Sequence, residues 1–304
     1  MQWGQIKTIF IISFLVLNLF LVQEFLDKIN TTTYDPLEKQ SPIEEQLSAQ
    51  GITYDLPEGD LKESYVSAPR YQLTEEDITA LEGFSDQQLI GLTSSQNAVL
   101  SLDTVLEGEP SLFNMEIITS EFKKPLELDL ENNLSGSIET IKSNIIKGDS
   151  YVFWNHYEDE NVLLFFQRQN NKTVYFNDSA ALIVLLNEEG NAIQYRQTML
   201  DDLEDRPDEQ TITDPINAIY SVWSNTVTGI PTDSHITLDL GYQTLVPLDD
   251  GVQVFVPTWD VIVNEQSHFF VNAMEGQYVQ HDEMKFVTER KEALKREIQE
   301  LKSE

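Results

Sequence analysis

The segment Ile9–Val22, IFIISFLVLNLFLV, decides how this chain is organised, because only Ser13 and Asn18 interrupt its run of apolar side chains. Residues 8–23 carry no charge, and sixteen residues of α-helix span about 24 Å. The hydrocarbon core of a bilayer is about 30 Å thick. Aromatic and lysine side chains on the two flanks can supply the missing length at the interfaces. We therefore predict one transmembrane helix over residues 3–26.

The residues around this segment favour an uncleaved signal anchor over a cleaved signal peptide. Cleavage needs small residues in an A-x-A-like arrangement, whereas the sequence that follows, VQEFLDKIN, offers none. Lys7 precedes the predicted helix, and Glu24 and Asp27 follow it, which predicts a cytoplasmic N-terminus. We expect residues 1–30 to form a short cytoplasmic stub and a single-pass anchor in the cell membrane, with the bulk of the chain extracytoplasmic.

The composition places the rest of the chain among folded, strongly acidic proteins. The 304 residues include 52 acidic and 19 basic side chains, for a net charge of −33. Aromatic residues make up 10% of the whole sequence. Such a surface repels phosphate, so nucleic acid and anionic lipid headgroups are poor candidate partners for the bulk of the protein. Cysteine is absent, which excludes disulfides, thiol nucleophiles and iron–sulfur sites.

Sequence motifs that carry enzyme chemistry, such as G-x-S-x-G, H-E-x-x-H or a glycine-rich phosphate loop, do not occur. We therefore name no catalytic, cofactor-binding or metal-binding residue and expect a protein that is not an enzyme. The acidic segment 201–209 lacks the alternation and the glycine of a calcium loop, and we interpret it as a solvated linker between the lobes, with a weak site for a divalent cation as the alternative. The side chains that could stack on a sugar or move a proton are better explained as core or strand residues: Trp154, Trp223, Trp259, His156 and His268.

Two similar units follow one another from residue 135 onwards. In the first, a helix at about Ser137–Lys147 precedes four strands. In the second, Asp214 caps a helix that Pro215 begins, and three strands follow. Polar turns between the strands favour antiparallel hairpins, so we predict an α+β fold with two helix-plus-antiparallel-sheet lobes. The predicted strands are residues 151–156, 162–168, 181–186, 192–199, 235–246, 252–263 and 268–273.

These patterns predict five parts of the chain. The anchor at 1–30 is followed by an N-terminal α+β segment at 31–134, a first lobe at 135–205, a second lobe at 206–276, and a charged helical tail at 277–304. Within the tail, four apolar residues fall on one helix face, and such a helix either packs on its own domain or binds a partner. The four are Val287, Leu294, Ile298 and Leu301.

Asn18 lies near the middle of the predicted span, where an amide gains from a hydrogen-bond partner on another helix. Ile11, Phe14, Leu21 and Phe25 lie seven or fewer positions away at helical spacing and share its face. We predict that these five residues contact a partner helix in the membrane. A passive anchor that tolerates a lone Asn is the alternative.

The N-terminal sequence MQWGQIKTIFIISFLVLNLFLVQEF resembles the start of the YycI (WalI) family of two-component regulatory proteins. Members of this family begin with a short stub that contains Trp and Lys, followed by an IFII-type span with a central Asn. Farther along, Phe269–Gly276 resembles the family's closing strand, preceded by a helix like Pro215–Trp223. The tail beyond Gly276 looks like an extension of the family pattern. The matching N-terminal positions are Trp3, Lys7, Thr8–Ile11, Leu17–Phe20 and Gln23.

The resemblance implies a regulator of the WalK (YycG) sensor histidine kinase of low-GC Gram-positive bacteria, with an effect on cell-wall metabolism. It implies action together with YycH, another single-span protein, through contacts with the transmembrane helices of the kinase. It also implies two α+β lobes similar to the C-terminal part of YycH. It leaves open whether the kinase is activated or restrained, which stimulus acts, and which surface binds the partner.

Two functions of other classes remain open from the residues alone. An anchored cell-wall glycosidase would use two carboxylates that lie far apart in sequence, and any acidic protein can supply such a pair. An anchored extracellular binding module would bind a wall ligand through its lobes. Exchange of the membrane helix distinguishes these functions, because only the kinase regulator requires the native helix.

Overall fold

The computed structural model describes residues 7, 10–18, 20–22, 42–57, 59, 61–94, 99–108, 114–226, 230–247 and 251–303. The chain divides into two compact units, Met1–Ala49 and Gln50–Glu304. In the first unit, residues 10–18 and 20–22 are helical, and a second helix, α2, covers Ile43–Ala49. Of the predicted N-terminal α+β segment 31–134, residues 31–41 lie outside the described residues.

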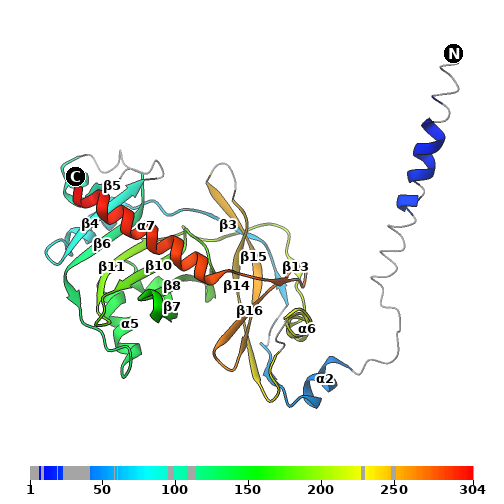
Figure 1. Ribbon diagram of the computed structural model, residues 1–304. Helices are drawn as coiled ribbons and strands as arrows, with labels where there is room; N and C mark the ends of the chain where they lie inside the picture. Colours follow the sequence, from blue (N-terminus) through cyan, green and yellow to red (C-terminus); the bar gives the residue numbers. More distant parts are fainter. Residues whose placement is uncertain are drawn as a thin grey trace. The chain divides into compact units, whose positions relative to one another are not determined.

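An eight-stranded antiparallel sheet forms one half of the second unit (Figure 1). Its main strands have the order β5-β4-β6-β11-β10-β8-β7, and β9 pairs with β8. The predicted hairpins are confirmed, because β7 pairs with β8 and β10 pairs with β11. The strands are β4 (Gln88–Ser94), β5 (Val99–Ser101), β6 (Met115–Leu126), β7 (Tyr151–Tyr157), β8 (Val162–Gln169), β9 (Lys172–Thr173), β10 (Ala181–Leu186) and β11 (Ala192–Thr198).

The pairing of β6 with β11 joins the N-terminal segment to the first predicted lobe. The division between residues 134 and 135 therefore separates strands of one sheet. The polar residues of β6 obscure this strand in the sequence. Thr119 and Ser120 are fully buried and have partners inside the fold, since the Ser120 hydroxyl donates to Gln88 Oε1 at 2.9 Å.

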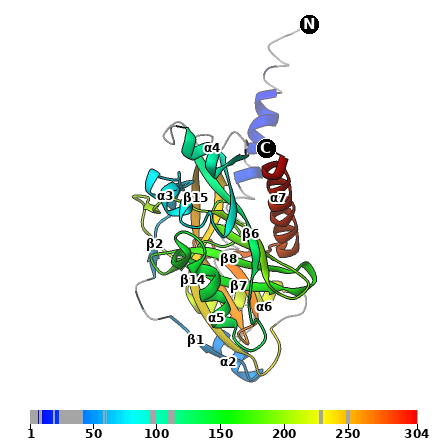
Figure 2. The same cartoon turned by 90° about the vertical axis from the view of Figure 1, so that its left-hand side faces the viewer.

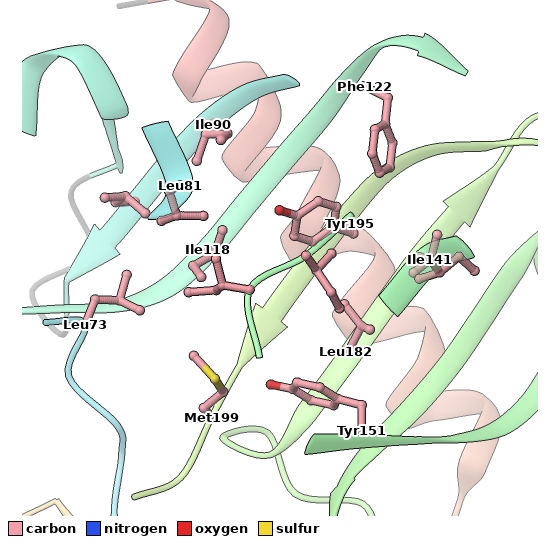
Figure 3. Close-up of a cluster of buried hydrophobic side chains, with 14 of the residues drawn as sticks. Leu73, Leu81, Ile90, Ile118, Phe122, Ile141, Tyr151, Leu182, Tyr195 and Met199 are labelled. Carbon is pink, nitrogen blue, oxygen red and sulfur yellow. The ribbon is translucent and has the colours of Figure 1, made fainter. Parts of the chain in front are cut away.

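The central strands of this sheet are buried on both faces, and helices cover each face. In β8, Leu163 and Phe165 belong to a core shared with the helices α3 (Glu75–Glu82), α4 (Leu102–Glu107) and α5 (Leu134–Ser143). Figure 3 shows Leu81 of α3 and Ile141 of α5 in this cluster, with Tyr151, Leu182 and Tyr195 of the strands. This face of the sheet therefore buries an apolar layer beneath three helices.

The opposite face packs against the C-terminal helix α7 (Glu283–Ser303), which crosses the sheet in Figures 1 and 2. The β8 residues that alternate with the first set, Val162, Leu164 and Phe166, share a cluster with three residues of the α7 stripe. The prediction of an amphipathic helix is confirmed, because the four stripe residues are at most 5% exposed. They are Val287, Leu294, Ile298 and Leu301.

The helix predicted at about Ser137–Lys147 begins and ends earlier, at Leu134–Ser143. Asn133 is its N-cap, because the Asn133 side chain accepts a hydrogen bond from the backbone N–H of Gly136 at 3.1 Å. Asn144 ends it, and a short 3₁₀ turn at Gly148–Ser150 leads into β7. A second 3₁₀ turn, Glu158–Glu160, connects β7 to β8.

A seven-stranded sheet forms the other half of the unit, with the order β1-β14-β15-β16-β17 and with β3 joining β15 to β12. The predicted meander is confirmed as β14, β15 and β16, and α6 (Pro215–Asn225) packs on it after the predicted cap at Asp214. The strands are β1 (Thr53–Asp55), β3 (Val66–Pro69), β12 (Glu204–Asp205), β14 (His235–Pro247), β15 (Val252–Val263), β16 (Ser267–Asn272) and β17 (Tyr278–Val279). A separate pair consists of β2 (Lys62–Glu63) and β13 (Gln210–Thr211).

The two sheets meet where the segment after β9 passes β14. The Tyr175 N–H donates to the Tyr242 carbonyl at 2.9 Å, and Val174 forms a parallel bridge with Tyr242. Gly241 permits this close approach, because a Cβ atom there would lie 2.4 Å from the carbonyl oxygen of Thr173. Both sheets therefore line the space beside this junction.

Candidate functional site

The predicted membrane contact lies in the first unit. Ile11, Phe14 and Asn18 line one shallow hollow along the helical segment, and all three side chains are exposed. Leu21 is also helical and exposed, whereas Phe25 lies outside the described residues. Three of the five predicted contact residues therefore share one face of the described helix.

The Asn18 side chain already makes one hydrogen bond. Its Nδ2 donates to the backbone carbonyl of Phe14 at 2.9 Å, one helical turn earlier. A carboxamide has a second N–H and a carbonyl oxygen, so this bond engages only part of its capacity. No helix among the residues that the structure describes is both long enough and apolar enough to cross a membrane.

A second candidate site is a cavity of about 500 Å³ between the two sheets of the second unit, which we call the seam cavity. It is lined by β7, β14, β15, β16 and the turn between β8 and β9. The side chains that give it chemical character are Trp154, Arg168, Asp239, Asp260 and His268. Pockets of about 300–1,000 Å³ with a few converging polar groups are typical of small-molecule sites.

The side chains of Asp260 and His268 lie within ion-pair distance of each other at the wall of this cavity. Nδ1 of His268 lies 2.9 Å from one Asp260 carboxylate oxygen and 3.0 Å from the other. The Asp260 side chain is only 2% exposed, against 24% for His268. Burial raises the pKa of the Asp260 carboxyl, and the nearby charge of Asp239 also raises it. The hydrogen bond from His268 acts in the opposite direction.

The sheet register explains why the two carboxyl groups are neighbours. Asp239 of β14 is directly opposite Asp260 of β15, so both side chains point to the same face. Their charges repel each other, and His268 on β16 supplies the compensating donor. His268, which its sequence pattern identifies only as a strand residue, is therefore also a polar partner of a buried carboxyl group. A single acidic residue within the apolar strand sequence VQVFVPTWDVIV was the signal that could have identified this cluster.

The acidic segment 201–209 lies outside the lining of the seam cavity, whereas Trp259 borders the cavity as a buried core residue. The acidic side chains of residues 201–209 are exposed. Trp259 is 2% exposed, and its indole N–H donates to the Thr213 carbonyl at 2.9 Å, as expected of a core residue. Within the described part of the chain, no group of three or more His, Asp or Glu side chains is arranged to hold a metal ion.

Comparison with known proteins identifies the family. Residues 33–274 match the YycI protein family, and a search of curated proteins finds no match. Among solved structures, the Bacillus megaterium YpeB C-terminal domain is similar, with 12% identity and a TM-score of 0.37, over 69% of this chain and 96% of that chain. Because the family match extends over most of the sequence, this chain belongs to the YycI family, which implies a regulatory role in the WalK two-component system.

Proposed function

We propose that this protein is a membrane-anchored, extracytoplasmic regulator of the WalK sensor kinase that acts through transmembrane helix contacts, together with a YycH-like partner. The family match over residues 33–274 carries the proposal, because it assigns the chain to regulatory proteins of this system. The apolar helical segments 10–18 and 20–22 support a role for the N-terminus in the membrane. In this proposal the short N-terminus is cytoplasmic and the unit Gln50–Glu304 lies outside the cytosol.

The mechanism would be a shift between two helix arrangements of the kinase. An additional helix changes that equilibrium only if it binds one arrangement more tightly than the other. A polar hydrogen bond between membrane helices contributes about 0.6–2 kcal/mol, which corresponds to roughly a 3- to 30-fold change in an equilibrium constant. One such bond is therefore enough to alter kinase output measurably.

Asn18 is the residue best suited to make this bond. Its bond to the Phe14 carbonyl uses one N–H, and the second N–H and the carbonyl oxygen can serve a partner helix. Ile11 and Phe14 lie along the same hollow and would surround the bond with apolar contacts. The exported lobes would bind the YycH-like partner and raise the effective concentration of the helices around the kinase.

The decisive experiment exchanges residues 3–26 for an unrelated membrane helix of equal length and keeps the rest of the chain. Kinase output is read in cells as the phosphorylated fraction of the response regulator. We expect the exchange to match a full deletion. An output equal to that of the wild type would contradict the helix mechanism and favour a function carried by the lobes.

A point variant tests the proposed hydrogen bond. Asn18→Leu should weaken co-purification with the kinase roughly 3- to 30-fold without impairing membrane insertion. Ser13→Leu is the matched control, because Ser13 is the other polar residue of the segment and lies on a different helix face. Equal co-purification of the two variants with the kinase would refute a specific role for Asn18.

A further inference from the structure

We propose that the seam cavity is a binding site for a neutral oligosaccharide. This inference does not depend on the helix mechanism, since it concerns only residues of the unit Gln50–Glu304. Three features support it: a rigid aromatic wall, a set of fixed polar groups, and a local balance of charge.

Trp154 provides the aromatic wall. Its ring lies 4.3 Å from that of His268 and 5.2 Å from that of Phe166, and it meets Tyr175 edge-on at 5.6 Å. These contacts hold the indole in one orientation, while the side chain remains partly exposed where it lines the cavity. A flat, fixed apolar surface suits the C–H face of a pyranose ring and costs little side-chain entropy on binding.

The polar groups beside this wall suit hydroxyl groups. Asp239 is exposed within the cavity and offers carboxylate oxygens as acceptors, and Asp260 is held in place by His268. Arg168 uses Nη2 to donate to the Asn171 carbonyl at 3.2 Å, and a guanidinium has further N–H donors. Like charges directly opposite each other in a sheet are destabilising, so the Asp239–Asp260 pair lowers the stability of the sheet. A ligand whose hydroxyl groups donate hydrogen bonds to these side chains would offset that loss.

The charge of the cavity argues for a neutral ligand. Two acidic side chains, Asp239 and Asp260, line the cavity together with the basic side chains Arg168 and His268. Lys172 also lines the cavity, but its ammonium group lies 2.5 Å from a Glu63 carboxylate oxygen and is neutralised there. The Asp pair would repel an anionic ligand, and Arg168 would repel a cationic ligand. A polyhydroxylated neutral ligand can use both kinds of group.

The test measures binding of defined tetrasaccharides to the full chain by isothermal titration calorimetry in a detergent without a sugar headgroup. The neutral probes are cellotetraose and tetra-N-acetylchitotetraose, and the cationic probe is fully deacetylated chitotetraose. Saturable binding of a neutral probe supports the proposal. Binding of the cationic probe alone, or of none of the three, overturns it.

Two variants locate the binding site. Trp154→Leu removes the aromatic wall and should weaken binding of the neutral probe at least tenfold, whereas Trp223→Leu, on helix α6 outside the cavity, is the matched control. Asp239→Asn changes an exposed side chain and leaves the packing intact, so it tests the cavity even if Trp154→Leu fails to fold. We expect a weakening of about three- to tenfold for Asp239→Asn. Unchanged affinity in Asp239→Asn, or equal losses in the two Trp variants, would overturn the assignment.

Discussion

Glu297 should be one of the most important polar residues for the stability of the second unit. It lies on α7, its side chain is 7% exposed, and its carboxylate lies 3.1 Å from Nε of Arg196, whose side chain is 8% exposed. The hydroxyl of the fully buried Thr119 donates to the same carboxylate. Glu297→Ala would leave a buried guanidinium without its main counterion, and removal of one partner of a buried pair costs about 3–5 kcal/mol.

The lower end of this range applies because Asp178 also approaches Arg196, at 3.8 Å. We therefore expect Glu297→Ala to lower the free energy of unfolding by about 3 kcal/mol. For a unit of this size, that loss lowers Tm by roughly 6–12 °C. Replacement of both partners, by Arg196→Met with Glu297→Leu, should restore part of the stability, because the guanidinium is no longer left unpaired, although the Thr119 hydroxyl loses its acceptor.

The assay is thermal and urea unfolding of the full chain, followed by circular dichroism. Glu300→Ala is the control, because Glu300 lies on the same helix and is exposed, so its replacement should change the stability by less than about 0.5 kcal/mol. If Glu297→Ala and Glu300→Ala unfold at the same temperature, the buried pair does not stabilise the packing of α7. That result would refute this reasoning.

Three further substitutions test other parts of the fold by the same assay. Leu294→Ala opens a cavity beneath α7, where Leu294 is fully buried, and should cost about 2–5 kcal/mol. Gly241→Ala places a Cβ against the backbone of Thr173 and should cost about 1–3 kcal/mol. Asp77 is buried, but hydrogen bonds from Tyr71, Thr74 and Lys147 outweigh that effect and lower its pKa below the ordinary 3.8. Asp77→Asn should therefore destabilise the protein at pH 7, and the difference from the wild type should shrink as the pH falls below 3.8 through the lowered pKa of the folded state.

The sequence predicted the parts of the fold in which local pattern and tertiary structure agree. Strands with continuous apolar runs and polar turns, such as β10 and β15, were found with their bounds. Helix α6 was found because Asp214 and Pro215 form a standard helix start. The strand β6 was missed because Glu116, Thr119 and Ser120 make it look polar, although all three are buried. Their partners come from distant segments, and no local pattern reveals such partners.

The seam cavity was hidden from the sequence for a related reason. Asp239, Asp260 and His268 lie on three strands, and only the register of those strands brings the side chains together. Register depends on the pairing of the whole sheet. Trp154 comes from the other sheet, so its approach to His268 also depends on the junction at Tyr242. The face shared by Ile11, Phe14 and Asn18, in contrast, follows from helical periodicity within one segment.

The C-terminal helix shows how a segment can lie beyond a family match and still be part of the fold. The match to the YycI family ends at residue 274, and α7 begins at Glu283. Yet Leu294 and Ile298 of α7 complete the apolar layer over Val162 and Leu164 of β8. Removal of α7 would expose that layer and the Arg196 side chain together. The helix is therefore a structural element of the second unit, although it lies beyond the family match.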